Sequence, residues 1–352
     1  MKLLRPVVAA LVVVALPVLT PVAAAVPPGS VVGAATSVGP AAGSAEALPS
    51  GSHAGSVRGL DLGSGVTTSS EAPAPIAPCS GPAPTVTTFG DTPPPVLGWT
   101  ENQAFDGLGR LWVSKTFLNR VDAYDDDGNV VASVPVRAPG GIASGPDGRM
   151  HVAAGTGYLA DRSDLVSFDP AVARPEVRVE TRLDSRKNGL AVDAHGNRYL
   201  TGLEDAGLTK VGPDGEVDVA WSRAAALGVA NGIAIDDETA YVTQSTDRTV
   251  VHVVPLDRPA DWTTIELTVP PVAARGLDDL DVTADALYVT SWTTGEVYRV
   301  DRTSGEACVV VGGIPRATSV LVADGFGDVG PDDLLVTSLH GPIRHVAVNA
   351  AP

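Results

Sequence analysis

The chain has 352 residues, with 24 Lys and Arg against 41 Asp and Glu, and its formal net charge is −17. An acidic chain repels a phosphate backbone, so the composition argues against a nucleic-acid partner. Its 38 glycines and 29 prolines, together with many Val and Thr, favour short strands joined by turns and give no sign of long helices.

Residues 1–25 have the features of a secretory signal peptide. Lys2 and Arg5 precede an apolar stretch that ends near Val18, and Ala23–Ala25 offers a cleavage site. The apolar stretch is short for a membrane span and contains proline. We therefore expect a secreted protein, extracellular or on the outside of the cell envelope, without a membrane span.

Residues 26–84 form a low-complexity segment rich in Ala, Gly, Pro and Ser. The segment has few large side chains and no regular apolar spacing, so it cannot bury enough surface to offset its ordering entropy. We expect a flexible linker or a processed leader ahead of one domain that spans residues 85–352.

A six-fold repeat fills that domain. Its copies are ENQAFDGLGRLWVS from Glu101, GGIASGPDGRMHVAAG from Gly140, NGLAVDAHGNRYLTG from Asn188, NGIAIDDETAYVTQS from Asn231, DDLDVTADALYVTSW from Asp278 and TSVLVADGFGDVGPDDLLVTS from Thr318. The copies begin 39, 48, 43, 47 and 40 residues apart, and each has room for four short strands. This period predicts an all-β fold, a six-bladed β-propeller.

The two ends of the repeat array are expected to meet. The sixth copy has no fourth strand, and Thr85–Phe89 can supply it, which removes the exposed edge of an open ring. Cys79 would then lie near the outer strand of the fifth copy, which contains Cys308. An exported chain with two cysteines permits a disulfide between them, and two free buried thiols are the alternative.

Two further expectations concern single elements. The aromatic residues at equivalent second-strand positions are expected to pack between blades, namely Trp112, Tyr199, Tyr241 and Tyr288. The sequence VDVAWS, residues 217–222, is expected to form the outer strand of the third copy, and a helical turn is considered only around residues 222–227.

The propeller plan brings the first residue of every copy to one end of the central channel. Glu101, Asn231 and Asp278 offer hard oxygen donors there, which suit Ca²⁺, Mg²⁺ or Mn²⁺. A cation bound by them would lower the pKa of a water molecule and polarise a carbonyl group. The alternative is that the Asn-Gly and Asp-Asp pairs only cap the loops that enter each strand. Their spacing leaves both interpretations open.

The loops after the second strands return to the same face. They carry Lys115, Trp292 and His340, and His340 is the one histidine placed to act as an acid or base. The sequence has no GxSxG, HExxH or P-loop motif, so it lacks the marks of a serine hydrolase, a zinc protease or a nucleotide-binding site.

The motifs ENQAFD, NGIAIDDETAYVTQS and DDLDVTADALYVTSW resemble those of the senescence-marker-protein/gluconolactonase family, which includes regucalcin-like proteins. The resemblance covers residues 101–348. It implies that Glu101, Asn231 and Asp278 bind one divalent cation on the axis, with Ca²⁺ favoured and Mg²⁺, Mn²⁺ or Zn²⁺ as alternatives. It also implies that Asn188 contacts the substrate, a lactone or small ester, and that Asp278 additionally serves as a catalytic base.

The chain also departs from the family pattern. Asp279 stands where the family usually has Gly, and the family's substrate-binding arginine has no clear match. Arg275 and Lys115 are the candidates to bind substrate in its place, together with Trp292, and His340 is the second candidate for catalysis.

Two other functions stay open from the sequence. One is a non-catalytic propeller that binds a ligand or a partner. The other is an enzyme similar to strictosidine synthase, which would use His340 as its base. For the hydrolase we expect a small-molecule substrate and a monomer.

Overall fold

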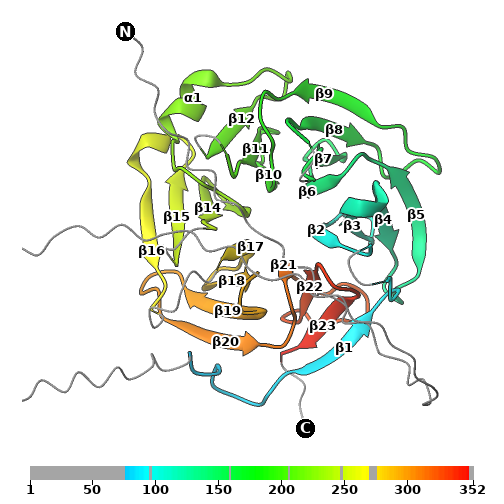
Figure 1. Cartoon of the computed structure of the whole chain (residues 1–352), viewed down its shortest axis with the longest axis vertical. Helices are drawn as coiled ribbons and strands as arrows, with labels where there is room; N and C mark the ends of the chain where they lie inside the picture. Colours follow the sequence, from blue (N-terminus) through cyan, green and yellow to red (C-terminus); the bar gives the residue numbers. More distant parts are fainter. Residues whose placement is uncertain are drawn as a thin grey trace, which may run out of the picture. The chain divides into compact units, whose positions relative to one another are not determined.

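The computed structural model describes residues 76–94, 97–157, 160–204, 207–245, 249–268 and 276–348. Over these residues the chain forms six antiparallel sheets around one axis, so the expected all-β, six-bladed propeller is confirmed (Figure 1). The expected signal peptide and residues 26–75 of the expected linker lie outside the described residues. Within the described residues, no helix is long and apolar enough to cross a membrane.

The strands follow one another from the axis to the rim in every blade (Figure 1). Blade 1 consists of β2 (Thr100–Phe105), β3 (Leu111–Lys115), β4 (Arg120–Tyr124) and β5 (Val130–Pro135). Blade 2 consists of β6 (Pro139–Ser144), β7 (Met150–Ala154), β8 (Asp164–Phe168) and β9 (Arg178–Arg182). Blade 3 consists of β10 (Leu190–Val192), β11 (Arg198–Thr201) and β12 (Leu208–Val211).

The other three blades each have four strands. Blade 4 consists of β13 (Ile233–Asp236), β14 (Thr239–Thr243), β15 (Val250–Pro255) and β16 (Thr263–Glu266). Blade 5 consists of β17 (Leu277–Val282), β18 (Ala286–Ser291), β19 (Glu296–Asp301) and β20 (Ala307–Val311). Blade 6 consists of β21 (Ala317–Val322), β22 (Leu334–Ser338), β23 (Ile343–Ala347) and the N-terminal β1 (Thr85–Phe89).

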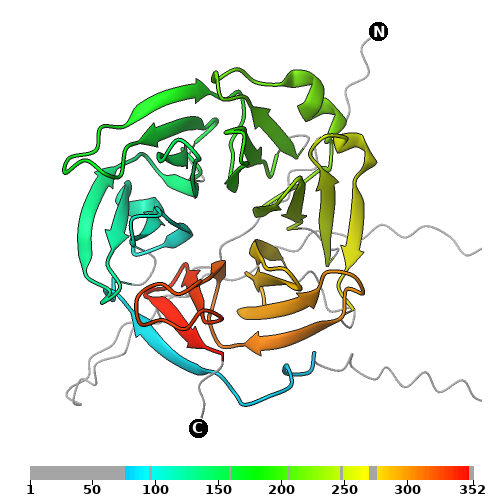
Figure 2. The ribbon, with the colours of Figure 1, turned by 180° about the vertical axis from the view of Figure 1, so that it is seen from behind.

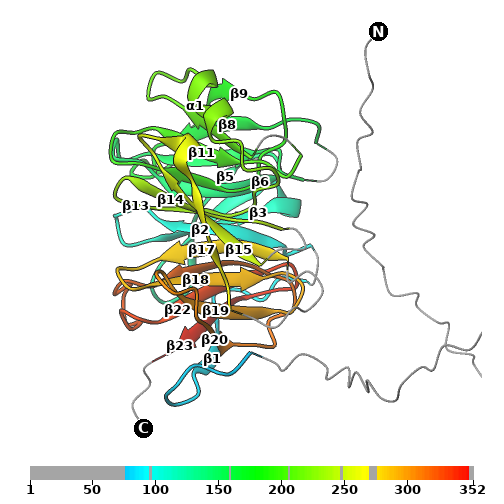
Figure 3. The same cartoon turned by 90° about the vertical axis from the view of Figure 1, so that its left-hand side faces the viewer.

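Strand β1 closes the ring as expected. It pairs with β23 in antiparallel register, from Thr85 opposite Ala347 to Phe89 opposite Ile343. Seen from behind and from the edge, β1 lies along the outside of β23 at the rim (Figures 2 and 3). The outer edge of the last blade is therefore covered by the first strand of the domain, and the six blades form one closed ring.

The expected outer strand of blade 3 is absent from the described residues, and that expectation was wrong. The chain there forms the helix α1 (Val219–Ala224) instead. Asp218 caps it, because its Oδ1 accepts a hydrogen bond of 2.9 Å from the backbone N–H of Trp221. The Trp221 ring packs on Tyr199 of β11 with ring centroids 5.1 Å apart, so the helix is packed against its own blade.

The apolar core lies between neighbouring blades. Trp112 is fully buried and packs against Phe168 of the next blade, with ring centroids 4.8 Å apart. Tyr199 and Tyr241 lie in similar clusters that reach into the following blade. The second-strand aromatic residues therefore join the blades to one another, as expected from their repeated position.

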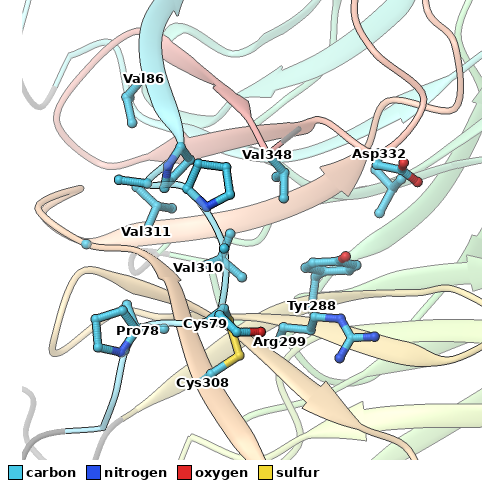
Figure 4. A pocket seen from close by; sticks show the side chains of 18 of the residues that line it. Pro78, Cys79, Val86, Tyr288, Arg299, Cys308, Val310, Val311, Asp332 and Val348 are labelled. Carbon is cyan, nitrogen blue, oxygen red and sulfur yellow. A yellow bond between two sulfur atoms is a disulfide. The ribbon is translucent and has the colours of Figure 1, made fainter. Parts of the chain in front are cut away.

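A disulfide connects Cys79 to Cys308 of β20, as expected. The chain around Cys79 also pairs with β20, since the N–H of Cys79 donates to the carbonyl of Val309 at 2.9 Å. Residues 78–84 run over a groove of about 970 Å³ on blades 5 and 6, whose floor includes Tyr288 and Arg299 (Figure 4). The N-terminal segment is thus fastened to blade 5 before it enters blade 6.

Candidate metal centre

Four polar residues lie where the inner strands begin. Glu101 and Asp278 are in β2 and β17, and Asn188 and Asn231 come just before β10 and β13. All four are more than nine-tenths buried. They come from blades 1, 3, 4 and 5, so the closed ring brings distant parts of the sequence to one place.

Their side chains interact in pairs and across the axis. Asn188 forms a hydrogen bond with the carboxyl group of Glu101. Asn231 forms one with Asp278, and the charges of Glu101 and Asp278 act on each other. The structure thus brings together Glu101, Asn231 and Asp278, which were expected to share a cation, and places Asn188 next to them.

Burial raises the pKa of the carboxyl groups in this cluster. It raises the pKa of Glu101 to about 8, against hydrogen bonds from Trp99 and Asn188, with a further rise from the charge of Asp279. It also raises the pKa of Asp278, and the charges of Glu101 and Asp279 add to that rise. Each acid resists ionisation because water is excluded and other acids are near.

Among the described residues, no basic side chain forms an ion pair with these acids. None of the ion pairs formed among the described residues reaches Glu101, Asp278 or Asp279. Buried charges are normally paired or bound to a metal. A cation on the axis would supply the missing positive charge.

The donor atoms fit a hard divalent cation. In the described part of the chain, the buried Oδ1 atom of Asn231 has no hydrogen-bond partner, which leaves this oxygen available as a ligand. The same residues contain no group of three Asp, Glu, His or Cys side chains at metal-binding spacing. A cation would therefore depend on amide oxygens as well as on Glu101 and Asp278, and such an all-oxygen set suits Ca²⁺ or Mg²⁺ better than Zn²⁺.

Threonine side chains hold the backbone of three of these residues. Each threonine lies at or next to the end of the second strand of one blade and donates a hydrogen bond to the carbonyl of the residue that begins the next copy of the repeat. Thr201 donates to Asn231, Thr243 to Asp278 and Thr337 to Glu101. The sequence shows these threonines in the recurring YLT, YVT and LVT, but their hydrogen-bond partners depend on how neighbouring blades are placed.

Glycine lets the inner strands approach one another. A Cβ on Gly232 would lie 2.4 Å from the Cα of Asp279, and one on Gly189 would lie 2.6 Å from the carbonyl oxygen of Asn231. Neither glycine has a positive φ. The Asn-Gly pairs therefore serve close contact between blades, which is a different reason for glycine from the loop cap considered above.

Asp279 follows Asp278 in β17 and lines a central channel. Its Oδ2 accepts a hydrogen bond of 2.8 Å from the Nδ2 of Asn102, across the axis. Burial raises the pKa of Asp279 to about 7. The channel has a volume of about 380 Å³ and is lined by the inner strands, including Asn102, Gln103, Asp279 and Asp281. Asp279 thus lines the channel while its charge acts on Glu101 and Asp278.

The other expected site residues have different surroundings. The Nζ of Lys115 lies 3.4 Å from the Oδ1 of Asp91 and 5.3 Å from the centre of the Tyr124 ring, so this ammonium faces the side of blade 1. Trp292 packs near Trp99 with the two rings tilted, and His340 is exposed in the turn after β22. Arg275 lies outside the described residues.

Trp99 was missed by sequence reasoning. Its Nε1 donates a hydrogen bond of 2.5 Å to the Oε2 of Glu101, which makes the indole ring a direct neighbour of the carboxylate. Trp99 precedes the first copy of the repeat, so it has no counterpart in the other copies. Only the bend of the chain before β2 brings it to the axis.

No protein-family profile matches this sequence, and no curated protein matches it. Solved structures do match the fold. A gluconolactonase from Xanthomonas campestris is 19% identical, with a TM-score of 0.53, over 78% of this chain and 98% of that one. A provisionally assigned gluconolactonase is 16% identical, with a TM-score of 0.54, over 78% of this chain and 94% of that one. A streptogramin B lyase is 9% identical, with a TM-score of 0.53, over 76% of this chain and 98% of that one.

These likenesses define the class of the molecule, a six-bladed β-propeller whose structure resembles gluconolactonases. The expected resemblance is thereby confirmed at the level of the fold. At such identities the chemistry has to be argued from the residues of this chain.

Proposed function

We propose that this protein is a metal-dependent hydrolase of a lactone or small ester. The observation that carries the proposal is the meeting of Glu101, Asn188, Asn231 and Asp278 on the propeller axis, with buried acids and a free amide oxygen. Glu101, Asn231 and Asp278 would hold one divalent cation, for which Ca²⁺ is the favoured ion. The similarity in fold to gluconolactonases supports the same reaction class.

When bound, the cation would polarise the substrate carbonyl and lower the pKa of a water molecule. The protein's own groups would do the rest. Asp278, a buried acid of raised pKa, would accept the proton of the attacking water at a carboxylate oxygen. Asn188 would orient the substrate through its amide group beside Glu101. His340, exposed on the same face, stays a candidate for returning a proton to the leaving oxygen.

The test combines chelation with one substitution. We expect purified protein to lose lactone hydrolysis on treatment with a chelator and to regain it with Ca²⁺. Asp278→Asn should lower Ca²⁺ affinity by at least about tenfold and activity by about a hundredfold or more. Asp127→Asn removes the same charge from an exposed turn and should change neither.

Turnover that persists after both chelation and Asp278→Asn would exclude this mechanism. Ca²⁺ binding without turnover of any lactone or ester would favour the non-catalytic binding propeller instead. Condensation of an amine with an aldehyde, dependent on His340, would favour the strictosidine-synthase-like alternative.

We also propose that the protein is exported and acts as a monomer on a small molecule. The disulfide is compatible with an oxidising compartment. Sequencing the N-terminus of protein recovered from the medium or the cell surface should show cleavage near residue 25, and sedimentation should show a single chain.

A further inference from the structure

An aromatic cluster, formed by Trp99, Phe117 and Trp292, lies beside the candidate metal centre. The ring centroids of Trp99 and Phe117 are 5.0 Å apart, and those of Trp99 and Trp292 are 6.1 Å apart. Arg316 places its guanidinium 5.4 Å from the centre of the Trp292 ring. These residues come from blades 1, 5 and 6, next to the strands that carry Glu101 and Asp278.

The cluster reaches from the buried carboxylate to the surface. At its inner end, Trp99 donates its hydrogen bond to Glu101. At its outer end, Phe117 is 41% exposed in the short 3-10 helix η1 (Thr116–Leu118), and the adjoining Leu118 is 39% exposed. A molecule whose reacting carbonyl lies near Glu101 would therefore have the rest of its structure against aromatic rings.

We propose that this aromatic cluster is a substrate subsite, which makes the protein select lactones or esters that carry an aryl or alkyl group over polyhydroxylated ones. The rings supply apolar area and edge or face contacts to a flat substituent. Sugar hydroxyls against the same rings would lose hydrogen bonds to water without replacement.

The reaction in this inference rests on the proposed function, but the binding preference does not. The experiment therefore measures binding and turnover separately. Binding is measured by calorimetry on Ca²⁺-loaded protein with two lactams that resist hydrolysis, a phenyl-substituted δ-lactam and gluconolactam. Turnover is measured with the corresponding lactones.

Phe117→Ser tests the outer end of the cluster, because the side chain is exposed and its removal leaves the core intact. The matched control is Leu108→Ser, since Leu108 is 57% exposed in the β2–β3 turn at the other end of those strands. We expect the phenyl lactam to bind the wild type more tightly than gluconolactam. Phe117→Ser should weaken the phenyl lactam about five- to tenfold and leave gluconolactam unchanged, and Leu108→Ser should change neither.

Equal or tighter binding of gluconolactam by the wild type would overturn the inference, as would an unchanged affinity for the phenyl lactam in Phe117→Ser. If the phenyl lactam binds through the cluster but no lactone is hydrolysed, the proposed hydrolase fails and the apolar subsite stands. Trp292→Ser gives a second reading of the same kind, because Trp292 makes no hydrogen bond to Glu101 among those the structure describes.

Discussion

Glu101 keeps a carboxyl group inside the propeller, next to Asp278 and Asp279. All three have raised pKa values because they are buried, and for Glu101 the value is about 8. The folded protein without metal therefore binds protons more tightly than the unfolded chain does, since a free glutamate ionises near pH 4.5. Stability gained from these acids is present below that pH and is lost as the pH rises toward 8.

This loss of stability with rising pH gives a prediction for protein freed of metal by a chelator. Its melting temperature should fall as the pH is raised from about 5 to 8.5, and Glu101→Gln should reduce that fall because one of the three acids no longer ionises. Added Ca²⁺ should raise the melting temperature more at pH 8 than at pH 5, since ligands must lose their protons to bind it. Thermal unfolding monitored by calorimetry checks both statements.

A melting temperature that rises with pH over this range in the chelated protein would contradict the prediction. Acids with lowered pKa values do not contribute to this change in melting temperature, because they affect stability only at lower pH. Glu180, whose pKa falls to about 2, is one of them.

Single residues also show what the sequence could reveal of the site. The roles of three residues could be predicted, because each begins a copy of the repeat and the propeller plan sends such positions to the axis: Glu101, Asn231 and Asp278. The roles of Trp99 and Asn102 could not be predicted, because their partners depend on the angle at which the chain enters blade 1 and on contacts across the axis.

Among the elements, the second strands of blades 3, 4, 5 and 6 share one device. In each, a threonine at or next to the end of the strand accepts a hydrogen bond from a backbone N–H near the start of its own inner strand and donates one to a carbonyl of the next blade. Thr243 accepts from the N–H of Gly232 at 2.8 Å and donates to Asp278. Thr290 accepts from Asp279 at 3.0 Å and donates to Thr318 at 3.0 Å.

The two threonines form a matched pair for a test of positioning. Thr243→Val should lower Ca²⁺ affinity by about tenfold, because the backbone of the ligand Asp278 loses a fixed partner. Thr290→Val removes an equally buried hydroxyl group that holds Thr318 and the backbone of Asp279, but not the carbonyl of Asp278 itself. It should cost similar stability, about 1–3 kcal/mol for a buried group left unpaired, with a smaller loss of Ca²⁺ affinity than Thr243→Val.

Calorimetric titration with Ca²⁺ and thermal unfolding of both variants give the two readouts. Equal loss of Ca²⁺ affinity in Thr243→Val and Thr290→Val would show that the threonines act on the ring as a whole. Thr243→Ser keeps the hydroxyl group and should restore most of the affinity.

The helix α1 shows where element prediction failed. The sequence VDVAWS alternates apolar and polar residues like a strand, and this pattern favoured a fourth strand in blade 3. Asp218 instead caps a helix, and Trp221 of that helix packs on Tyr199. A strand here could gain only edge pairing with β12, and the helix buries the large Trp221 side chain as well.

At the scale of the whole molecule, the period of the repeat was enough to predict the number of blades and the closing strand. The 39- to 48-residue spacing of the copies allows four strands and little else, and a sixth copy without its own last strand requires a donor. The pairing of β1 with β23 meets that requirement. The groove under residues 78–84 could not be predicted from the sequence, since its shape depends on how the segment crosses two blades.

The disulfide predicts a measurable share of the stability. It joins residues 229 positions apart, so it shortens a long loop of the unfolded chain. Replacing both Cys79 and Cys308 by serine should lower the free energy of unfolding by about 2–5 kcal/mol. Denaturant unfolding of the double variant measures this loss, and wild-type protein treated with a reductant serves as a parallel sample.

Ca²⁺ affinity should stay unchanged in that double variant, because no axial residue lines the groove beside the disulfide. An unchanged midpoint of unfolding would mean that the hydrogen bonds of Cys79 and Ala77 with Val309, together with β1, fasten the segment without the covalent bond.

The pairing of β1 with β23 sets the order in which the molecule can be completed. β1 is among the first parts of the domain to leave the ribosome, yet its partner, Ile343–Ala347, is among the last. During synthesis the earlier blades can form while the ring is open, and β1 must wait through more than two hundred residues of sequence. A nascent chain arrested before residue 343 would hold an unsatisfied strand at each end of its arc, ready to pair with a second unfinished copy.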